Sequence, residues 1–161
     1  RRLHDLAGLF AEPVAPERAQ ELVYTVSEIP AAADASSLPS STTVIRPGRV
    51  GEELFMTKGH FHARRERAEI YVGLAGAGRL VMATDDGRAV VEPMGPGTVS
   101  YVPGHWAHRS VNVGDEPLVF YAVYPGDAGY DYATIADEGF PVLVLAGDDG
   151  PRVVPNPRYR A

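Results

Sequence analysis

The chain contains no cysteine among its 161 residues. This absence excludes a disulfide framework, a thiolate nucleophile, a thiolate zinc site and an iron–sulfur cluster. Any metal ion that the protein binds must therefore use nitrogen and oxygen ligands.

The chain also lacks a long apolar segment and a block of basic residues. Its longest apolar stretches, 117–123 and 140–146, are far shorter than the roughly 20 residues that a membrane-spanning helix needs. With 21 acidic and 15 basic residues the formal net charge is −6. We therefore expect neither a membrane nor a nucleic acid as partner. Residues 3–10 are too short and too polar for a signal peptide, so a cytoplasmic location is expected.

Glycine and proline, by contrast, are frequent, with 17 and 14 residues. They separate short apolar runs, a pattern typical of an all-β sandwich or barrel. The length suits one domain, which we expect to span residues 1–161, with a short N-terminal helix over residues 3–10. The expected strands are 22–26, 42–45, 53–56, 69–74, 79–83, 88–92, 99–102, 109–112, 118–124 and 142–145.

Two turns are indicated by their residues. Thr84-Asp85-Asp86-Gly87 places Asp-Gly between two alternating runs, which is the strongest short-range signal of a β-hairpin. Gly147-Asp148-Asp149-Gly150 also predicts a turn, after which Val153-Val154 can pair with the preceding strand. The segment 31–41 is rich in Ala and Ser without a period, so we interpret it as a surface connection.

Four of the five histidines lie between positions 60 and 108, and two of them form His60-Phe61-His62. In an extended strand, residues i and i+2 project from the same face about 6 to 7 Å apart, so both imidazoles can reach one ion. Glu69 can add a carboxylate oxygen, and His108 would arrive from a distant strand. A lone histidine is more often a hydrogen-bonded core or surface residue, so it is the cluster that indicates a metal site. This ligand set suits Fe, Mn, Ni, Co or Zn.

The spacing of these residues resembles the two cupin motifs. In order along the chain they are His60, His62, Glu69 and Gly76, then Gly97, Pro103, His108 and Asn112. Two positions depart from the pattern: the gap between His62 and Glu69 is longer than usual, and His105 replaces a Gly. The resemblance implies an all-β cupin double-stranded β-helix, a jelly-roll barrel with extra flanking strands and a metal-binding core at about residues 40–125.

Five segments further resemble the cupin-type glucose-6-phosphate isomerases, the archaeal-type phosphoglucose isomerase family. They are 47–52, 57–62, 69–71, 102–112 and 124–132, and the likeness covers roughly residues 20–135. It implies a metal-dependent isomerase that interconverts glucose 6-phosphate and fructose 6-phosphate by hydrogen transfer between C1 and C2. It also implies one divalent ion per chain, with iron expected first, and a homodimer that serves glycolysis and gluconeogenesis.

The resemblance assigns roles by position. The implied metal ligands are His60, His62, Glu69 and His108. The implied contacts to the sugar phosphate are Tyr24, Thr43, Thr57, Gly59, Tyr71 and Tyr124. The implied catalytic residues are Glu69, Tyr130 and Tyr132. At Tyr130 the family usually has His, and a phenol with a pKa of about 10 is a weaker base near neutral pH than an imidazole of about 6.5.

Other interpretations stay open on the sequence alone. The tyrosines are also ordinary barrel-facing strand formers, and Arg64, Arg65 and Arg67 are interpreted as a solvated turn. Alternative functions are another metal cupin enzyme, such as a mannose-6-phosphate isomerase or a dioxygenase, and a non-catalytic sugar- or metal-binding cupin. Tyr130 keeps the non-catalytic alternative open, and the sequence does not decide between an enediol and a hydride-shift route.

Overall fold

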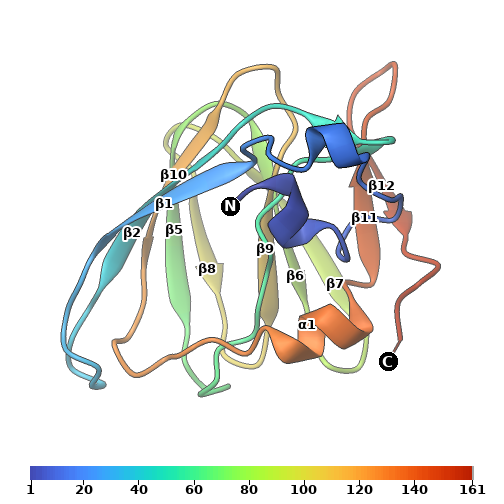
Figure 1. Cartoon of the computed structure of the whole chain (residues 1–161). Coiled ribbons are helices and arrows are strands. Elements are labelled where there is room, and N and C mark those ends of the chain that lie inside the picture. Colours follow the sequence, from blue (N-terminus) through green and yellow to red (C-terminus); the bar gives the residue numbers. More distant parts are fainter. Residues whose placement is uncertain (161) are drawn as a thin grey trace.

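The computed structural model describes residues 1–160, which form mostly antiparallel strands (Figure 1). The helical elements are η1 (Leu3–Leu6), η2 (Pro16–Arg18) and α1 (Ala133–Glu138). The strands are β1 (Tyr24–Ile29), β2 (Ser40–Ile45), β3 (Arg49–Val50), β4 (Glu53–Leu54), β5 (Glu69–Ala75), β6 (Gly78–Ala83), β7 (Ala89–Met94), β8 (Val99–Val102), β9 (Ala107–Asn112), β10 (Leu118–Val123), β11 (Val142–Leu145) and β12 (Arg152–Pro155). Within the described residues, no helix is long and apolar enough to cross a membrane.

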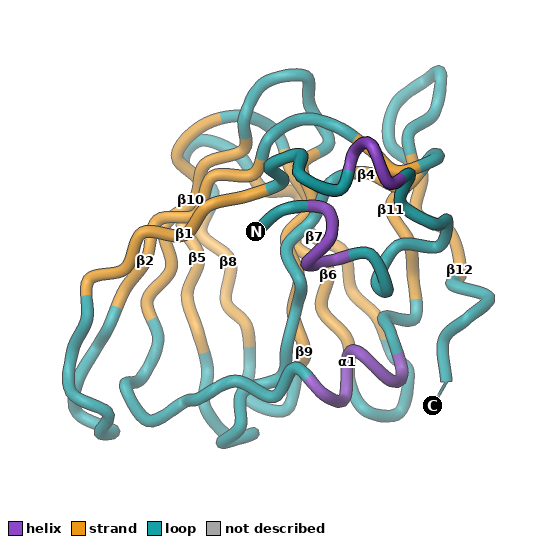
Figure 2. The backbone as a smooth tube through the Cα atoms, viewed as in Figure 1, coloured by secondary structure: helices purple, strands orange, loops and turns teal. Residues whose placement is uncertain are grey.

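The strands form two facing sheets and a flanking one. The first has the order β1-β2-β10-β5-β8, the second β7-β6-β9, and the flanking sheet β12-β11-β4-β3. Figure 1 shows the first two on opposite sides of the barrel, with β1, β2, β10, β5 and β8 on the left. Figure 2 shows α1 across the lower end. Several neighbouring strands are distant in sequence and all pairs are antiparallel, which confirms the predicted jelly-roll barrel with flanking strands.

Strand alternation decides which side chains enter the barrel. In β10, Leu118, Phe120 and Ala122 are buried, whereas the residues between them are half-buried. Ala122 pairs with Tyr71 of β5, so these two residues share the inner face. The same face carries the pocket-lining side chains of β2.

Strand β9 is buried at every residue. On one side it pairs with β6, and on the other the 56–60 segment runs beside it through the bridges Met56–Val111 and His60–His108. A strand covered on both edges and both faces is a rigid support for a functional side chain. His108 is carried by this strand.

Both predicted turns are confirmed. The Asp-Gly hairpin joins β6 to β7, with the Thr84 N–H donating to the Arg88 carbonyl over 3.0 Å. Strands β11 and β12 pair across the second turn, with Val144 opposite Val153. These elements follow from local sequence because turn residues fix the register of the adjoining strands.

Several predicted boundaries are wrong. The N-terminal helix is a 3-10 turn over Leu3–Leu6 rather than a helix over 3–10, although Leu3, Leu6 and Phe10 are buried as its apolar pattern requires. The strand expected at 22–26 starts and ends later, as β1. Strand β4 ends at Leu54 instead of residue 56. Strand β3 and helix α1 were not predicted, because they are too short to show a period.

Candidate active site

The four predicted metal ligands converge in one cluster. One ligand atom from each of His60, His62, Glu69 and His108 lies within 4.8 Å of the other three. Backbone pairing brings them together, because His60 and His108 exchange two N–H···O bonds of 3.3 and 3.0 Å. Glu69 enters as the first residue of β5. The group could hold a metal ion.

The imidazoles of His62 and His108 meet one carboxylate oxygen. Nε2 of His62 lies 3.2 Å from Oε2 of Glu69, and Nε2 of His108 lies 3.0 Å from the same atom. On the other side of the His62 ring, Nδ1 lies 2.9 Å from the carbonyl oxygen of Arg67. A carbonyl only accepts, so Nδ1 of His62 carries a proton, and Nε2, which here hydrogen-bonds Oε2 of Glu69, is the ring nitrogen that faces the cluster.

Two ring nitrogens in this cluster are buried without a partner. Among residues 1–160, Nε2 of His60 has no hydrogen-bond partner, and Nε2 of His108 approaches Glu69 without hydrogen-bond alignment. An unsatisfied buried polar atom costs about 1 to 3 kcal/mol, and a bound ion or water is one way to satisfy it. A divalent cation fits this set, because imidazole nitrogens and a carboxylate oxygen are its common protein ligands.

The protonation states also suit a cation. Burial by itself raises the pKa of Glu69, but the contacts with His108 and His62 outweigh it and lower the pKa to about 2. Burial and the neighbouring His108 hold the pKa of His60 well below its usual value. Near neutral pH the carboxylate is therefore ionised and the His60 ring neutral, the states in which both groups bind metal ions.

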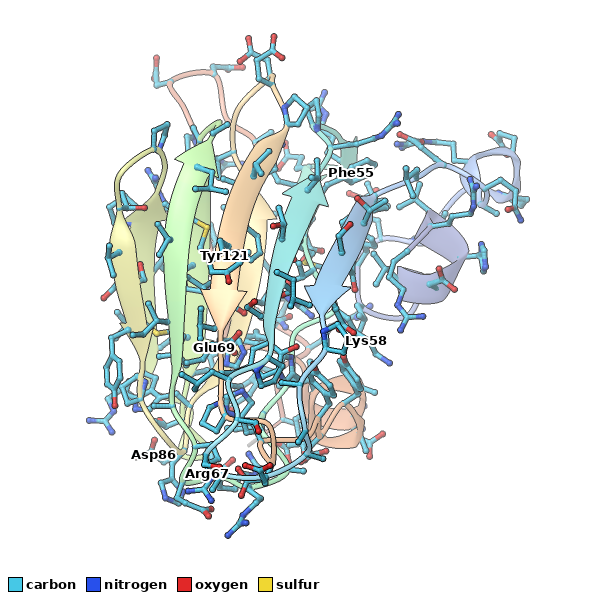
Figure 3. All side chains as sticks on the ribbon, turned by 90° about the vertical axis from the view of Figure 1, so that its left-hand side faces the viewer. Phe55, Lys58, Arg67, Glu69, Asp86 and Tyr121 are labelled. Atoms are coloured by element: carbon cyan, nitrogen blue, oxygen red, sulfur yellow. The ribbon has the colours of Figure 1, made fainter. Side chains whose placement is uncertain are left out.

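A cavity of about 650 Å³ opens beside the cluster. Its lining among the described residues includes His60, Glu69 and His108 but not His62. All the positions that the resemblance assigns to the sugar phosphate also line it, namely Tyr24, Thr43, Thr57, Gly59, Tyr71 and Tyr124. Figure 3 shows Glu69 and Lys58 in the lower half of the barrel and Arg67 at its lower rim.

Barrel strands place several of these residues by alternation. Ser41 and Thr43 of β2 share the inner face, so both line the cavity, although only Thr43 was predicted to do so. The i, i+2 relation to Thr43 was the sequence signal for Ser41. Gly59 has a φ of 75°, and a Cβ there would lie 2.7 Å from the Phe140 ring. This position therefore requires glycine.

Tyr130 and Tyr132 line the cavity as a stacked pair. Their ring centroids are 5.6 Å apart with an interplanar angle of 11°. Tyr130 also lies edge-on to His60 at 4.9 Å, and its hydroxyl donates to the Tyr124 hydroxyl over 3.2 Å. Burial and the bond to Tyr124 raise the pKa of Tyr130 far above its usual value. The phenol is therefore neutral at physiological pH.

Lys58 is a cation on the same wall. Its Nζ lies 4.6 Å from the centre of the Tyr132 ring, a cation–π distance. The residue lines the cavity beside Thr57 and Gly59. It therefore adds a basic side chain to the lining of the cavity.

The interpretation of Arg64, Arg65 and Arg67 as a solvated turn is wrong for two of them. The side chains of Arg65 and Arg67 are only 29% and 24% exposed. Arg65 pairs with Asp131 and Arg67 with Asp127, both more than 50 residues away in the chain. The turn is real, but its guanidinium groups face protein carboxylates.

His105 adopts the backbone of the glycine it replaces. Its φ is 67°, in the left-handed region that glycine favours. The backbone N–H of His105 donates to the carbonyl of Arg65. The second-motif loop therefore keeps the shape expected of its usual residue.

Comparisons with known proteins match nearly the whole chain to one family. The family model described as glucose-6-phosphate isomerase (GPI) matches residues 1–154. The chain is 48% identical over 164 residues to the glucose-6-phosphate isomerase of Pyrococcus horikoshii, which covers 99% of this chain and 87% of that protein. It is 41% identical over 155 residues to that of Sinorhizobium medicae, covering 93% of this chain and 72% of that protein.

Solved structures support the fold. Bacillus subtilis oxalate decarboxylase, a cupin with Mn(II) centres, superposes with a TM-score of 0.53 and 26% identity over 66% of this chain. This chain spans only 27% of the oxalate decarboxylase chain, so the likeness concerns the barrel. The sequence matches, in contrast, run through nearly the whole chain, and the family model spans the region that holds the cluster. The chain belongs to the glucose-6-phosphate isomerase family.

Proposed function

We propose that the protein is a metal-dependent isomerase that interconverts glucose 6-phosphate and fructose 6-phosphate. One observation carries the proposal: a buried cluster of three imidazoles and a carboxylate borders a cavity of about 650 Å³ in a chain of this isomerase family. A pocket of that size accommodates a hexose phosphate.

The residues that would hold the ion are His60, His62, Glu69 and His108. A bound divalent cation would act as a Lewis acid on the sugar oxygens at C1 and C2. We propose one ion per chain, with iron first and Mn, Ni, Zn or Co as alternatives, because the donor set suits all of these ions. The Mn(II) centres of the oxalate decarboxylase barrel support a transition metal in this fold.

Isomerisation moves one hydrogen from C2 to C1 and one proton from O2 to O1, so no external oxidant is needed. We propose Glu69 as the base for the carbon-bound hydrogen. Its Oε2 makes both contacts with the imidazoles. The low pKa of about 2 makes Glu69 a weak base by itself.

Tyr130 and Tyr132 are proposed to act on the oxygens rather than on carbon. A neutral phenol donates a hydrogen bond, and both rings lie within 5.4 Å of the His60 ring centre. Their hydroxyls are therefore placed to hydrogen-bond a sugar oxygen beside the cluster. Replacement of the usual His by Tyr130 makes this residue a donor instead of a base.

The phosphate is proposed to bind on the wall formed by Tyr24, Thr43, Thr57, Gly59 and Tyr124, with Tyr71 closer to the cluster. Thr57 Oγ1 accepts the Ser110 N–H over 3.0 Å, which leaves its own O–H available as a donor. The backbone N–H of Gly59 and the Lys58 ammonium complete a site with the usual donors for a phosphate.

We further infer one cupin domain over residues 1–161, with the metal-binding core at about 40–125, that assembles as a homodimer. The outer face of the five-stranded sheet supports the dimer, because Ile70, Val99 and Tyr101 are 44%, 69% and 60% exposed there. Figure 3 views this face, with Tyr121 on β10. Apolar faces of this kind are typical of protein–protein contacts. We also propose that the protein acts in the cytoplasm, as an enzyme of glycolysis and gluconeogenesis.

A coupled assay of glucose 6-phosphate formation from fructose 6-phosphate tests the proposal. A second arm supplies mannose 6-phosphate and measures formation of fructose 6-phosphate, and a third arm records oxygen uptake. We expect turnover with fructose 6-phosphate and no oxygen uptake. Preference for mannose 6-phosphate, oxygen consumption, or binding without turnover would favour one of the alternative cupin functions.

A further inference from the structure

Three ion pairs join the 63–67 loop to the 124–132 segment, two of them at Asp127 and one at Asp131. Arg67 contacts both carboxylate oxygens of Asp127, with Nε 2.8 Å from Oδ1 and Nη2 2.6 Å from Oδ2. Nη2 of Arg65 donates to Oδ2 of Asp131 over 2.9 Å. We call these two pairs, Arg67–Asp127 and Arg65–Asp131, the clasp. Its partners come from regions that are remote in sequence.

At one end of the clasp, Arg67 contacts His62 of the candidate metal cluster. The backbone carbonyl of Arg67 accepts Nδ1 of His62, while its guanidinium binds Asp127. Arg67 therefore touches the cluster segment through its main chain and the opposite segment through its side chain. A side-chain substitution at Arg67 or Asp127 leaves the carbonyl that orients His62 in place.

The other end carries the tyrosine wall of the cavity. Tyr124, Tyr130 and Tyr132 line the cavity from the 124–132 segment. They are half-buried or exposed, so packing in the hydrophobic core does not fix them. The backbone of the segment is held by a pair of N–H···O bonds between Phe61 and Asp131, of 3.2 and 2.8 Å.

The Arg67–Asp127 pair has the geometry of a strong contact. A fork of two parallel N–H···O bonds is more specific and stronger than a single contact. The side chain of Asp127 is 12% exposed, and Arg64 adds a third bond to it of 2.6 Å. Isolated surface pairs contribute little, whereas a network with bidentate geometry can hold a segment.

We propose that Arg67 and Asp127 are positioning residues of the isomerase, whose ion pair holds the tyrosine wall against the metal cluster. Neither Arg67 nor Asp127 is among the described residues that line the cavity. They act on the substrate through Tyr124, Tyr130 and Tyr132. The inference rests on the proposed use of this cavity for a sugar phosphate.

The test compares Asp127→Asn, Asp127→Ala and Arg67→Ala with a matched ion-pair control. Asp127→Asn keeps the side-chain volume and removes the charge. The control is Glu52→Gln, which breaks the exposed 3.0 Å pair with Arg152 away from the cavity. The readouts are KM, kcat, metal content, calorimetric affinity for glucitol 6-phosphate, and amide exchange of a peptide spanning 124–134. Glucitol 6-phosphate has no carbonyl, so it binds without reacting.

We expect the Asp127 and Arg67 variants to raise KM and the Kd for glucitol 6-phosphate about tenfold, which is about 1.4 kcal/mol. Metal content should stay at the wild-type level, and exchange in the 124–134 peptide should become faster. The double variant Arg67→Ala/Asp127→Ala should be no worse than Asp127→Ala alone, because both changes remove the same contact. The Glu52→Gln control should match the wild type.

Two results would overturn the proposal. In the first, the variants lose thermal stability but keep wild-type KM, analogue affinity and exchange, which would make the pair purely structural. In the second, Asp127→Asn loses the metal. Failure of the proposed function itself gives a different result. If the wild-type protein shows no turnover, the effect of the clasp is still measured by comparing analogue binding and amide exchange between the wild type and the variants.

Discussion

Nε2 of His108 lies 3.0 Å from Oε2 of Glu69, and the two side chains are only 1% and 4% exposed. A carboxylate with a pKa of about 2 is ionised at this depth, and it faces three imidazoles. Burial of a charge is unfavourable unless a partner or a metal ion compensates it. We therefore propose that a divalent cation completes the cluster.

His108→Ala tests the ligand set. Removing a ligand should weaken metal binding by at least about 100-fold, beyond the usual loss for a supporting residue. The measurement is metal content after dialysis against a competing chelator. His4→Ala, at an exposed histidine outside the cluster, is the control and should keep wild-type content. Full occupancy in His108→Ala would count against the site.

Metal binding should stabilise the fold, because it satisfies Nε2 of His60 and Nε2 of His108. A ligand at 100 times its Kd adds about 2.7 kcal/mol to the free energy of unfolding. For a chain of this size, that corresponds to a rise in Tm of roughly 5 to 10 °C. Calorimetry of the chelated and the reloaded protein measures it. Equal Tm values in both states would contradict a metal at this cluster.

Tyr130→His should raise the rate of isomerisation by restoring a base. Burial and the Tyr124 bond raise the pKa of Tyr130, so the wild-type phenol does not ionise near neutral pH. An imidazole accepts a proton only in its neutral form, so the gain should appear above a pH of about 6.5 and disappear below it. The pH dependence of kcat/KM measures this change.

Tyr130→Phe is the matched control for that substitution. It retains the ring that stacks on Tyr132 and removes only the hydroxyl that donates to Tyr124. We expect the Tyr130→Phe variant to lower kcat/KM without adding an ionisation. A Tyr130→His variant no faster than the wild type at any pH would show that this position is not limited by the missing base.

The outer sheet face should carry the dimer contact. Tyr101→Asp places a charge on a residue that is 60% exposed on β8, and it should shift the protein toward monomers in sedimentation. Val153→Asp, at a 45% exposed residue of β12, introduces the same charge on the flanking sheet and should leave the assembly unchanged. A wild-type protein that sediments as a monomer at micromolar concentration would contradict the homodimer.

Local signals made much of the barrel predictable. Asp86-Gly87 specifies its hairpin through turn chemistry, and alternation in 118–123 specifies which residues face inward. The segment 133–138 gave no such signal, because a helix of six residues is too short to show an amphipathic period. The position of this helix depends on tertiary contacts, which the local sequence does not reveal.

The site also contains residues that the sequence predicts and residues that it does not. His60 and His62 were predictable from i, i+2 spacing, and His108 from its motif, since the barrel brings fixed motif positions together. The Arg67–Asp127 pair was not, because its partners are 60 residues apart and any exposed turn has the same composition. Tertiary contacts of this kind leave no local pattern in a single sequence.

The most direct test of the account is isomerase activity against equivalents of metal added to the chelated protein. We expect no turnover of fructose 6-phosphate without metal, and a linear rise in activity that ends at one equivalent of metal per chain. The same titration of His108→Ala should stay flat over that range. Full turnover in the metal-free protein would contradict the account.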